Sequence, residues 1–193
     1  MLSSLRGEKV DKIKLSNNDV RNYVHAIIRQ LNQDGFKPDY IVGLTRGGLL
    51  PATMLSHYLN VPMETLKVSL RDGNESETNC WMSEDAFGYV SIDVQEIIKS
   101  RWDPSARKKI LIVDDINDSG ATFNWIKKDW ETSCCPKEKH AWESVWGKTT
   151  RFAVLVNNEN SEFADVNYSG MSINKFEDPH IWIDFPWENW WED

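Results

Sequence analysis

The segment Lys109–Thr122, with the sequence KILIVDDINDSGAT, constrains the fold of this chain more than any other stretch. Four aliphatic residues, Ile110 to Val113, lead directly into carboxylates, and a small turn with a glycine follows. A short continuous apolar run is typical of a strand buried on both faces in a parallel sheet. The turn is typical of a helix start, where free backbone N–H groups and the helix dipole favour an anion. The segment therefore predicts an α/β fold with an anion site where this strand ends.

Three acids, Asp114, Asp115 and Asp118, adjoin this turn. Carboxylates at that place can face sugar hydroxyls or a metal ion, while the backbone N–H groups of the turn hold a phosphate. A phosphorylated sugar requires that combination. A calcium-binding loop that begins at Asp115 is a weaker explanation. Its twelfth position would be Ile126, where such loops carry a bidentate glutamate. A plain strand-to-helix connection is weaker too, because adjacent carboxylates without a partner cation repel one another.

The remaining pattern alternates strands with helices. A helix is predicted to begin at Ser16, with Asp19 in the capping-box position, and to end at Gly35. This order of elements predicts an α/β fold with a central, mostly parallel sheet flanked by helices. The other predicted strands are Tyr40–Leu44, Glu64–Leu70 and Phe152–Val156, and the other predicted helices are Pro51–Leu59, Asp93–Lys99 and Thr122–Trp130.

Composition limits the size of the domain, the partners that it can bind and the compartment in which we expect it. With 193 residues, 40% of them hydrophobic, the chain is long enough for one domain with a real core. A net charge of −8 argues against a nucleic-acid partner, and no run approaches the ~18 apolar residues that span a bilayer. Cys80, Cys134 and Cys135 show no C-x-x-C spacing, and the first residues lack the apolar segment of a signal peptide. We therefore expect a cytoplasmic protein that binds neither nucleic acid nor membrane.

Three blocks together resemble one enzyme family. VDDINDSGAT resembles the phosphoribosyl pyrophosphate (PRPP) signature of the type I phosphoribosyltransferases. Val42–Ala52 resembles their pyrophosphate loop, and Trp182–Trp187 resembles the base-binding segment of the bacterial xanthine-guanine and hypoxanthine phosphoribosyltransferases. The blocks follow the family's order over residues 39–187. The resemblance implies the type I phosphoribosyltransferase fold.

The resemblance also implies a domain organisation. Residues 1–193 would form a single phosphoribosyltransferase domain, with a core at about 36–160 and a small C-terminal hood with the base-binding segment at about 161–193. A flexible lid loop, Leu70–Phe87, would close over pyrophosphate. Arg71–Lys108 and Glu131–Thr150 are expected to include family-specific insertions. Most of the tryptophans outside the three blocks are expected to be packing residues; they are Trp81, Trp102, Trp125, Trp130, Trp142 and Trp146.

Roles for the polar residues follow from the resemblance. Asp114 and Asp115 would face the ribose hydroxyls of PRPP and help to hold Mg²⁺, and Asp118 would exchange the ring proton of the base. Ile116 and Asn117 would be spacers. Family members often hold a strained or cis peptide in the pyrophosphate loop. The residues implied to bind the 5′-phosphate or pyrophosphate are Ser119, Gly120, Ala121, Thr122, Thr45, Arg46, Gly47 and Arg71.

The base would be held by the third block. Trp182 would stack on a flat heterocycle, and the main chain near Ile183 and Asp184 would contact its exocyclic groups. A rival interpretation is an aromatic strand that packs in a core or a dimer interface. Asn157 stands where the 6-oxopurine enzymes carry a lysine that donates to the purine O6. Asparagine can donate a hydrogen bond, but it is shorter and uncharged.

The function implied is a Mg²⁺-dependent nucleotide-salvage enzyme. It would convert a free nucleobase, expected to be a purine, to its 5′-mononucleotide with release of pyrophosphate. Relatives are commonly dimers or tetramers, so a homo-oligomer is expected. Two alternatives stay open. One is a PRPP- or nucleotide-binding regulator with little catalysis, and the other is a phosphoribosyltransferase for a pyrimidine or modified base.

Overall fold

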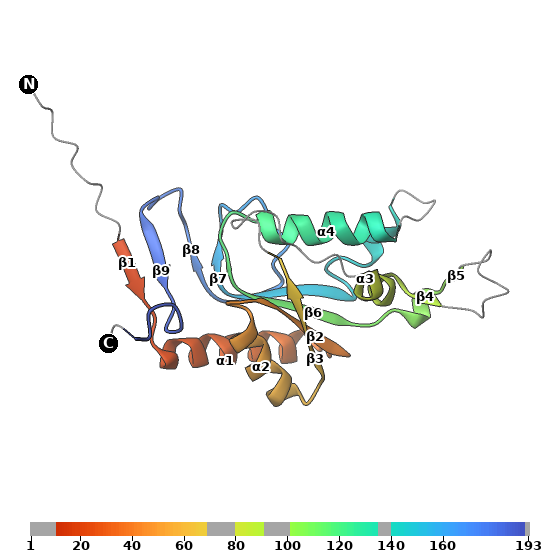
Figure 1. Cartoon of the computed structure of the whole chain (residues 1–193), viewed down its shortest axis with the longest axis horizontal. Helices are drawn as coiled ribbons and strands as arrows, with labels where there is room; N and C mark the ends of the chain where they lie inside the picture. The colour runs from red at the N-terminus through yellow and green to blue at the C-terminus, as the bar shows by residue number, and fades with distance from the viewer. Residues whose placement is uncertain (1–10, 69–79, 91–100, 135–139, 192–193) are drawn as a thin grey trace, which may run out of the picture.

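A parallel sheet of five strands forms the centre of the protein (Figure 1). The computed structural model describes residues 11–68, 80–90, 101–134 and 140–191. The strand order is β3-β2-β6-β7-β8, and every neighbouring pair is parallel. This arrangement confirms the predicted fold class. The strands are β2 (Tyr40–Thr45), β3 (Met63–Lys67), β6 (Ile110–Asn117), β7 (Thr150–Asn158) and β8 (Tyr168–Ile173).

Helices cover both faces of this sheet. Helices α1 (Asn17–Asp34) and α2 (Leu49–Leu59) lie on one face, and α3 (Cys80–Phe87) and α4 (Ala121–Ser133) lie on the other (Figure 1). Successive residues of β6 alternate between the two layers. Leu111 packs in the cluster that includes α1 and α2, and Ile112 packs in the cluster that includes α3 and α4. The continuous apolar run of β6 is therefore buried on both faces, as predicted.

The predicted capping signals of α1 are confirmed. The Ser16 hydroxyl accepts from the backbone N–H of Asp19, and the Asp19 carboxylate accepts from the backbone N–H of Ser16. Gly35 ends the helix in the left-handed conformation, with φ of 67°. One apolar face of this helix packs against the sheet, and its buried members are Val20, Val24, Ile27, Ile28 and Leu31.

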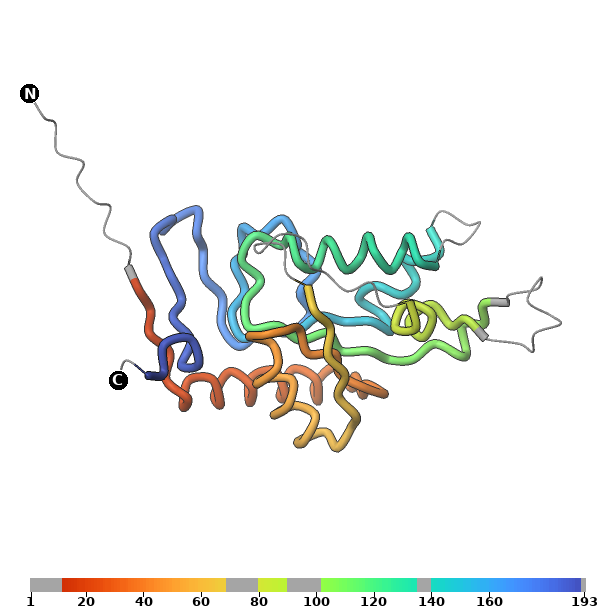
Figure 2. The backbone as a smooth tube through the Cα atoms, in the orientation of Figure 1, coloured from red at the N-terminus to blue at the C-terminus, as the bar shows by residue number. Residues whose placement is uncertain are grey.

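The two ends of the chain meet in a small separate ribbon. Strand β1 (Asp11–Lys14) pairs in parallel with β9 (Ile181–Asp184), and the tube in Figure 2 shows these strands beside one another. The C-terminal residues 161–193, predicted to form a hood, thus pair with a strand from the N-terminal part of the chain. Helix α1 and strand β8 also lie outside the range 36–160 that was assigned to the core from the sequence. Helix α1 packs on the main sheet, and β8 is one of its strands.

Part of the predicted lid is core. Cys80–Phe87 forms α3, where Met82, Ala86 and Phe87 are fully buried. The prediction of a lid is therefore wrong for these residues, because their apolar side chains pack against α4 rather than remain free. Residues 70–79 of that lid and the predicted helix Asp93–Lys99 lie outside the described residues.

The segment Glu131–Thr150 supplies aromatic packing. Beyond α4 it contains the short helix η3 (Ala141–Ser144), and the ring of Trp142 stacks on Trp146 with centroids 5.0 Å apart. Trp130 is fully buried beside them, and Trp125 is partly buried against the same core. The packing role predicted for most of the six tryptophans is confirmed, although Trp81 and Trp102 are 45% and 38% exposed. The remaining short elements are β4 (Tyr89–Val90), β5 (Arg101–Trp102) and η2 (Pro104–Ala106).

Candidate functional site

The acidic residues lie where β6 ends, at the carboxyl edge of the sheet. Strand β6 continues through Asp114 and Asp115 to Asn117, four residues beyond the predicted apolar run. Oδ1 of Asp114 accepts from the backbone N–H of Asp115 at 2.9 Å. Oδ1 of Asp115 accepts from the backbone N–H of Ile116 at 2.8 Å. These local bonds fix both carboxylates at the edge where ligands bind in open α/β sheets.

The predicted pyrophosphate loop lies against these acids. A β-carbon added to Gly47 would stand 1.7 Å from Oδ2 of Asp115. One added to Gly48 would stand 2.4 Å from the carbonyl oxygen of Val113. Only glycine permits both approaches. The peptide between Thr45 and Arg46 is cis. The fold therefore brings two of the three blocks together, with the Arg46 side chain exposed beside them.

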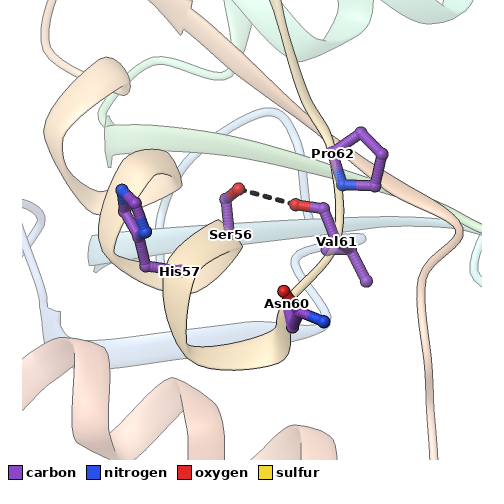
Figure 3. A pocket seen from close by; sticks show the side chains of 5 residues that line it. All are labelled: Ser56, His57, Asn60, Val61 and Pro62. Atoms are coloured by element: carbon purple, nitrogen blue, oxygen red, sulfur yellow. Dashed lines mark hydrogen bonds between the residues drawn. The ribbon is translucent and has the colours of Figure 1, made fainter.

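The far end of α2 carries a separate pocket (Figure 3). It has a volume of about 390 Å³ and is lined by Ser56, His57, Asn60, Val61 and Pro62. None of these belongs to the three blocks, and α2 runs between this pocket and the Gly47 loop. We therefore place the functional site at the Gly47 end of α2.

The electrostatics of Asp115 favour a cation nearby. Burial raises the pKa of this carboxyl above its usual value, and the charge of Glu188 acts in the same direction. Hydrogen bonds from Asp114 and from the backbone N–H of Ile116 oppose that rise in pKa. A divalent cation would offset the cost of burying the charge. In the described part of the chain there is no cluster of three or more potential metal-ligating side chains. A pair of carboxylates suits Mg²⁺, because proteins usually bind this ion through one or two carboxylates, and substrate phosphates and waters complete its coordination.

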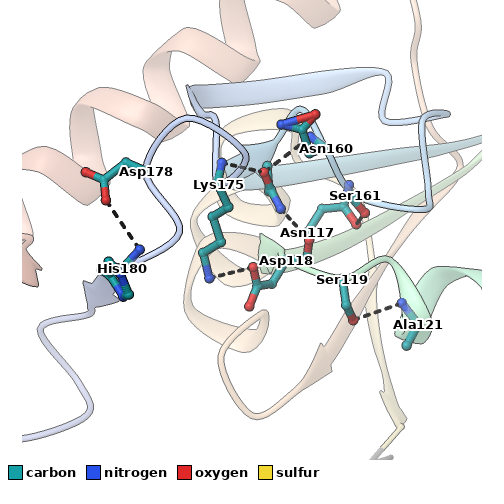
Figure 4. Close-up of polar contacts among 10 residues, drawn as sticks. Asn117, Asp118, Ser119, Ala121, Asn160, Ser161, Lys175, Asp178 and His180 are labelled. Carbon is teal, nitrogen blue, oxygen red and sulfur yellow. Dashed lines mark hydrogen bonds and ion pairs between the residues drawn. The ribbon is translucent and has the colours of Figure 1, made fainter. Parts of the chain in front are cut away.

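The turn after Asp118 is shaped as a helix start. Gly120 takes φ of 85° and caps α4, and the cap has no side-chain hydrogen bond. A β-carbon on Gly120 would stand 2.5 Å from the backbone nitrogen of Phe163. Within this turn the N–H of Ala121 donates to Oγ of Ser119 at a long distance of 3.4 Å (Figure 4). Ser119 is exposed and Thr122 half-buried, so hydroxyls and N–H groups line one turn that can hold an anion.

Asp118 meets a residue that the sequence did not single out. Nζ of Lys175 lies 2.7 Å from Oδ1 of Asp118 (Figure 4). The amide of Asn158 joins the two chain segments, because its Nδ2 donates to the carbonyl of Asp118 at 2.9 Å and its Oδ1 accepts from the N–H of Lys175 at 3.2 Å. Nothing in the sequence placed Lys175 here, since it stands in a polar stretch after β8 with no motif around it.

Asn117 is a buried hub, so the prediction that it is a spacer is wrong. Its Nδ2 donates to Oδ1 of Asn157 at 2.9 Å and to the carbonyl of Phe163 at 3.0 Å. Its Oδ1 accepts from the hydroxyl of Ser161 at 2.9 Å. Its side chain is almost fully buried. Asn157 directly follows the buried run Phe152–Val156, which was a signal for a polar group at the end of β7, and it stands opposite Asn117 in the neighbouring strand.

The segment predicted to bind the base, Trp182–Trp187, begins on β9 in the small ribbon. Trp182 is 46% exposed, whereas Ile183 is buried in the core. Oδ1 of Asp184 accepts from Nδ2 of Asn189 at 3.3 Å. Among the described residues, no hydrogen bond connects these three residues to Asp118. Arg71 lies outside the described residues.

Comparison with known proteins defines the class. The model of the phosphoribosyl transferase domain family matches residues 12–190, so the chain belongs to that family and is a phosphoribosyltransferase. It is 21% identical to a xanthine phosphoribosyltransferase of Saccharomyces cerevisiae, over 92% of this chain and 90% of that protein. It is 22% identical to a hypoxanthine-guanine phosphoribosyltransferase of Schizosaccharomyces pombe, over 86% of each.

A solved structure supports the same assignment. The crystal structure of a purine phosphoribosyltransferase from Pyrococcus horikoshii OT3 superposes with a TM-score of 0.58 at 25% identity, covering 92% of this chain and 95% of that one. The resemblance seen in the sequence is therefore confirmed. None of the helices in the described ranges is long and apolar enough to cross a membrane.

Proposed function

We propose that this protein transfers the 5-phosphoribosyl group of PRPP to a purine base in nucleotide salvage, forming a purine 5′-mononucleotide and releasing pyrophosphate. The observation that carries the proposal is the contact between Asp115 and Gly47. It joins acids suited to a ribose to a loop suited to pyrophosphate. The relatives named for xanthine, hypoxanthine-guanine and purine support a purine as the acceptor.

The leaving group sets the main electrostatic demand. Breaking the bond from C1 of the ribose to pyrophosphate leaves an oxocarbenium-like carbon and a strongly anionic product. The guanidinium of Arg46 and the backbone of Thr45 and Gly47 would bind that product, and Arg71 is proposed to assist. Asp114 and Asp115 would hold Mg²⁺ and face the ribose hydroxyls. The ion would supply positive charge that stabilises the departing pyrophosphate.

The base would be held between Asp118 and the hood. A purine that carries its ring proton on N7 attacks C1 of the ribose through N9, and the N7 proton passes to the Asp118 carboxylate. Trp182 is proposed to stack on the base, with the main chain of Ile183 and Asp184 near its edge and Asn157 beneath it. Correct placement of N9 then supplies most of the remaining acceleration.

The 5′-phosphate anchors the sugar at the start of α4. Its oxygens would accept from the N–H groups of Gly120, Ala121 and Thr122 and from the hydroxyls of Ser119 and Thr122. Gly120 has no side chain to compete for these donors, and the N–H of Ala121 makes only a long hydrogen bond of 3.4 Å to Oγ of Ser119. The positive end of the helix dipole adds to the attraction for the dianion.

We also propose that the protein works in the cytoplasm as a homo-oligomer, a dimer or tetramer. Trp190 and Trp191 support this, because they are 70% and 63% exposed at the C-terminal end. Adjacent exposed aromatic residues favour a protein contact. Sedimentation equilibrium of wild type and of Trp190→Ala/Trp191→Ala tests it, and a monomeric wild type would contradict it.

The activity is tested with a panel of bases. Purified protein, PRPP and Mg²⁺ are incubated with hypoxanthine, guanine, xanthine, adenine, uracil or orotate, and pyrophosphate and mononucleotide are quantified. We expect turnover with at least one purine, and loss of turnover on chelation of the metal. Turnover with pyrimidines alone would overturn the proposal of a purine acceptor and support the alternative, a phosphoribosyltransferase for a pyrimidine. Tight binding of nucleotides with no pyrophosphate released from any base would instead support the regulator.

A further inference from the structure

The turn that opens α4 rests on residues 161–163, a loop that follows β7. The backbone N–H of Glu162 donates to the carbonyl of Ser119 at 3.1 Å. A β-carbon on Gly120 would stand 2.5 Å from the backbone nitrogen of Phe163 and 2.7 Å from Oγ of Ser161. Because Gly120 caps α4 without a side chain, contacts with the 161–163 loop set the place of this turn.

The ring of Phe163 extends the same support into α4. Its centroid lies 5.0 Å from the centroid of Phe123, in the first turn of α4, and 4.8 Å from that of Phe152 on β7. All three rings are almost fully buried. Close-packed interiors transmit displacements, so a shift of the 161–163 loop would move the start of α4 with it.

The side chain of Asn117 holds this loop. Its Nδ2 donates to the carbonyl of Phe163 at 3.0 Å, and its Oδ1 accepts from the hydroxyl of Ser161 at 2.9 Å (Figure 4). The same hydroxyl accepts from the N–H of Phe163 at 3.1 Å. The second N–H of the amide donates to Oδ1 of Asn157 at 2.9 Å. A primary amide has two donors, so both are used, and one orientation of the side chain satisfies all three partners.

Asn117 is placed to act through other residues. It is only 2% exposed, so a ligand at the turn does not touch it. An aliphatic side chain would fill the same space with no polar group to satisfy, whereas a buried amide costs free energy unless it is hydrogen-bonded. A fully bonded polar network fixes one arrangement of the groups that it joins. The amide therefore gives the loop, and with it the turn, a single defined position.

We propose that Asn117 is a positioning residue for the 5′-phosphate site. Through Ser161 and Phe163 it holds the turn after Asp118 where its N–H groups meet the phosphate, and Asn157 fixes the orientation of its amide. The inference rests on the proposed function, which places the 5′-phosphate at the start of α4. The pyrophosphate loop is built against Asp115 instead, so it should not depend on this network.

Two ligands that report on different halves of the site test this role. Ribose 5-phosphate reports on the turn, and pyrophosphate with Mg²⁺ reports on the Gly47 loop. Asn117→Leu keeps the size of the side chain and removes its three hydrogen bonds. Calorimetry on the full chain should show ribose 5-phosphate binding weakened about tenfold, the loss expected when one or two hydrogen bonds to the phosphate are misplaced. Pyrophosphate binding should be unchanged, whereas a general loss of structure would weaken both.

A smaller change covers the case in which Asn117→Leu does not fold. Ser161→Ala removes one hydroxyl that bonds to Asn117 and to the N–H of Phe163. It should weaken ribose 5-phosphate binding by a smaller factor than Asn117→Leu and again leave pyrophosphate binding unchanged.

Another asparagine provides the matched control. Oδ1 of Asn167 accepts from the N–H of Phe152 at 2.9 Å, near the start of β7 and so at the opposite end of that strand from Asn157. Asn167→Leu should lower the stability of the protein and leave both affinities unchanged. If Asn117→Leu and Ser161→Ala keep the wild-type ratio of the two affinities, the positioning role is overturned. A wild type that binds neither ligand and uses no base would instead overturn the proposed function.

Discussion

The carboxylate of Asp115 occupies the space that a side chain on Gly47 would need. A β-carbon there would be 1.7 Å from Oδ2 and 2.3 Å from Cγ of Asp115. The two residues belong to different blocks, one after β2 and the other at the end of β6, and these strands are neighbours in the sheet. The position of Asp115 thus requires the glycine as much as its own loop does.

The first prediction concerns this contact. Gly47→Ala should displace Asp115 or the loop, because a real β-carbon essentially never approaches an oxygen so closely. We expect PRPP binding to weaken at least tenfold, measured by calorimetry with Mg²⁺ present. Gly35→Ala is the control. It has open space around it but φ of +67°, so it should lower stability by roughly 1–2 kcal/mol and leave PRPP binding unchanged. Equal PRPP affinity in Gly47→Ala and wild type would contradict the prediction.

The second prediction separates proton transfer from sugar binding. Asp118→Asn removes the proposed proton acceptor but keeps the shape of the side chain. Turnover should fall about 10²- to 10⁴-fold, the usual contribution of general acid–base catalysis, with the PRPP constant nearly unchanged. Asp165→Asn breaks the comparable ion pair with Lys127 and should change neither quantity. A large rise in the PRPP constant with turnover intact would contradict the role of Asp118.

The third prediction concerns the base. Trp182 is 46% exposed, so Trp182→Ala should fold normally. Base binding should weaken by about 1–3 kcal/mol, the range for stacking of a base on an aromatic ring. Trp81→Ala is the control, since Trp81 is similarly exposed, at 45%, and lies outside the three blocks. Unchanged base affinity in Trp182→Ala would favour the rival interpretation, in which this tryptophan belongs to a packing surface.

The sequence predicted those parts of the candidate site whose structure depends on neighbouring residues in the chain. Ile110–Val113 can only be buried on both faces, and Gly120 can take the positive φ that opens α4. Contacts between distant segments were not predictable. The pairing of β1 with β9 joins four-residue strands from opposite ends of the chain, and strands this short have little intrinsic preference to guide them. Lys175 reaches Asp118 only because β8 lies beside β7. The helix α3 was missed because it is only eight residues long and follows a long polar stretch.

The fourth prediction concerns the pH dependence of stability at the start of α1. Hydrogen bonds from the hydroxyl and the backbone of Ser16 lower the pKa of Asp19 below its ordinary value of 3.8. A carboxyl whose pKa is lower in the folded state stabilises the fold above its unfolded-state pKa. That contribution is lost as the pH falls through the folded-state value. Asp19→Asn should therefore be less stable than wild type at pH 7, and the difference should shrink below pH 3.8.

Urea denaturation at a series of pH values measures this difference. Ser16→Ala removes the hydroxyl that accepts from the N–H of Asp19 and donates to its carboxylate. The double variant with Asp19→Asn then completes a cycle. The two substitutions should be less than additive at pH 7, because each removes the same reciprocal cap. They should approach additivity in acid, where the protonated carboxyl of Asp19 is a weaker acceptor. A stability difference between wild type and Asp19→Asn that stays constant from pH 7 into acid would show that the charge on Asp19 plays no part in the cap.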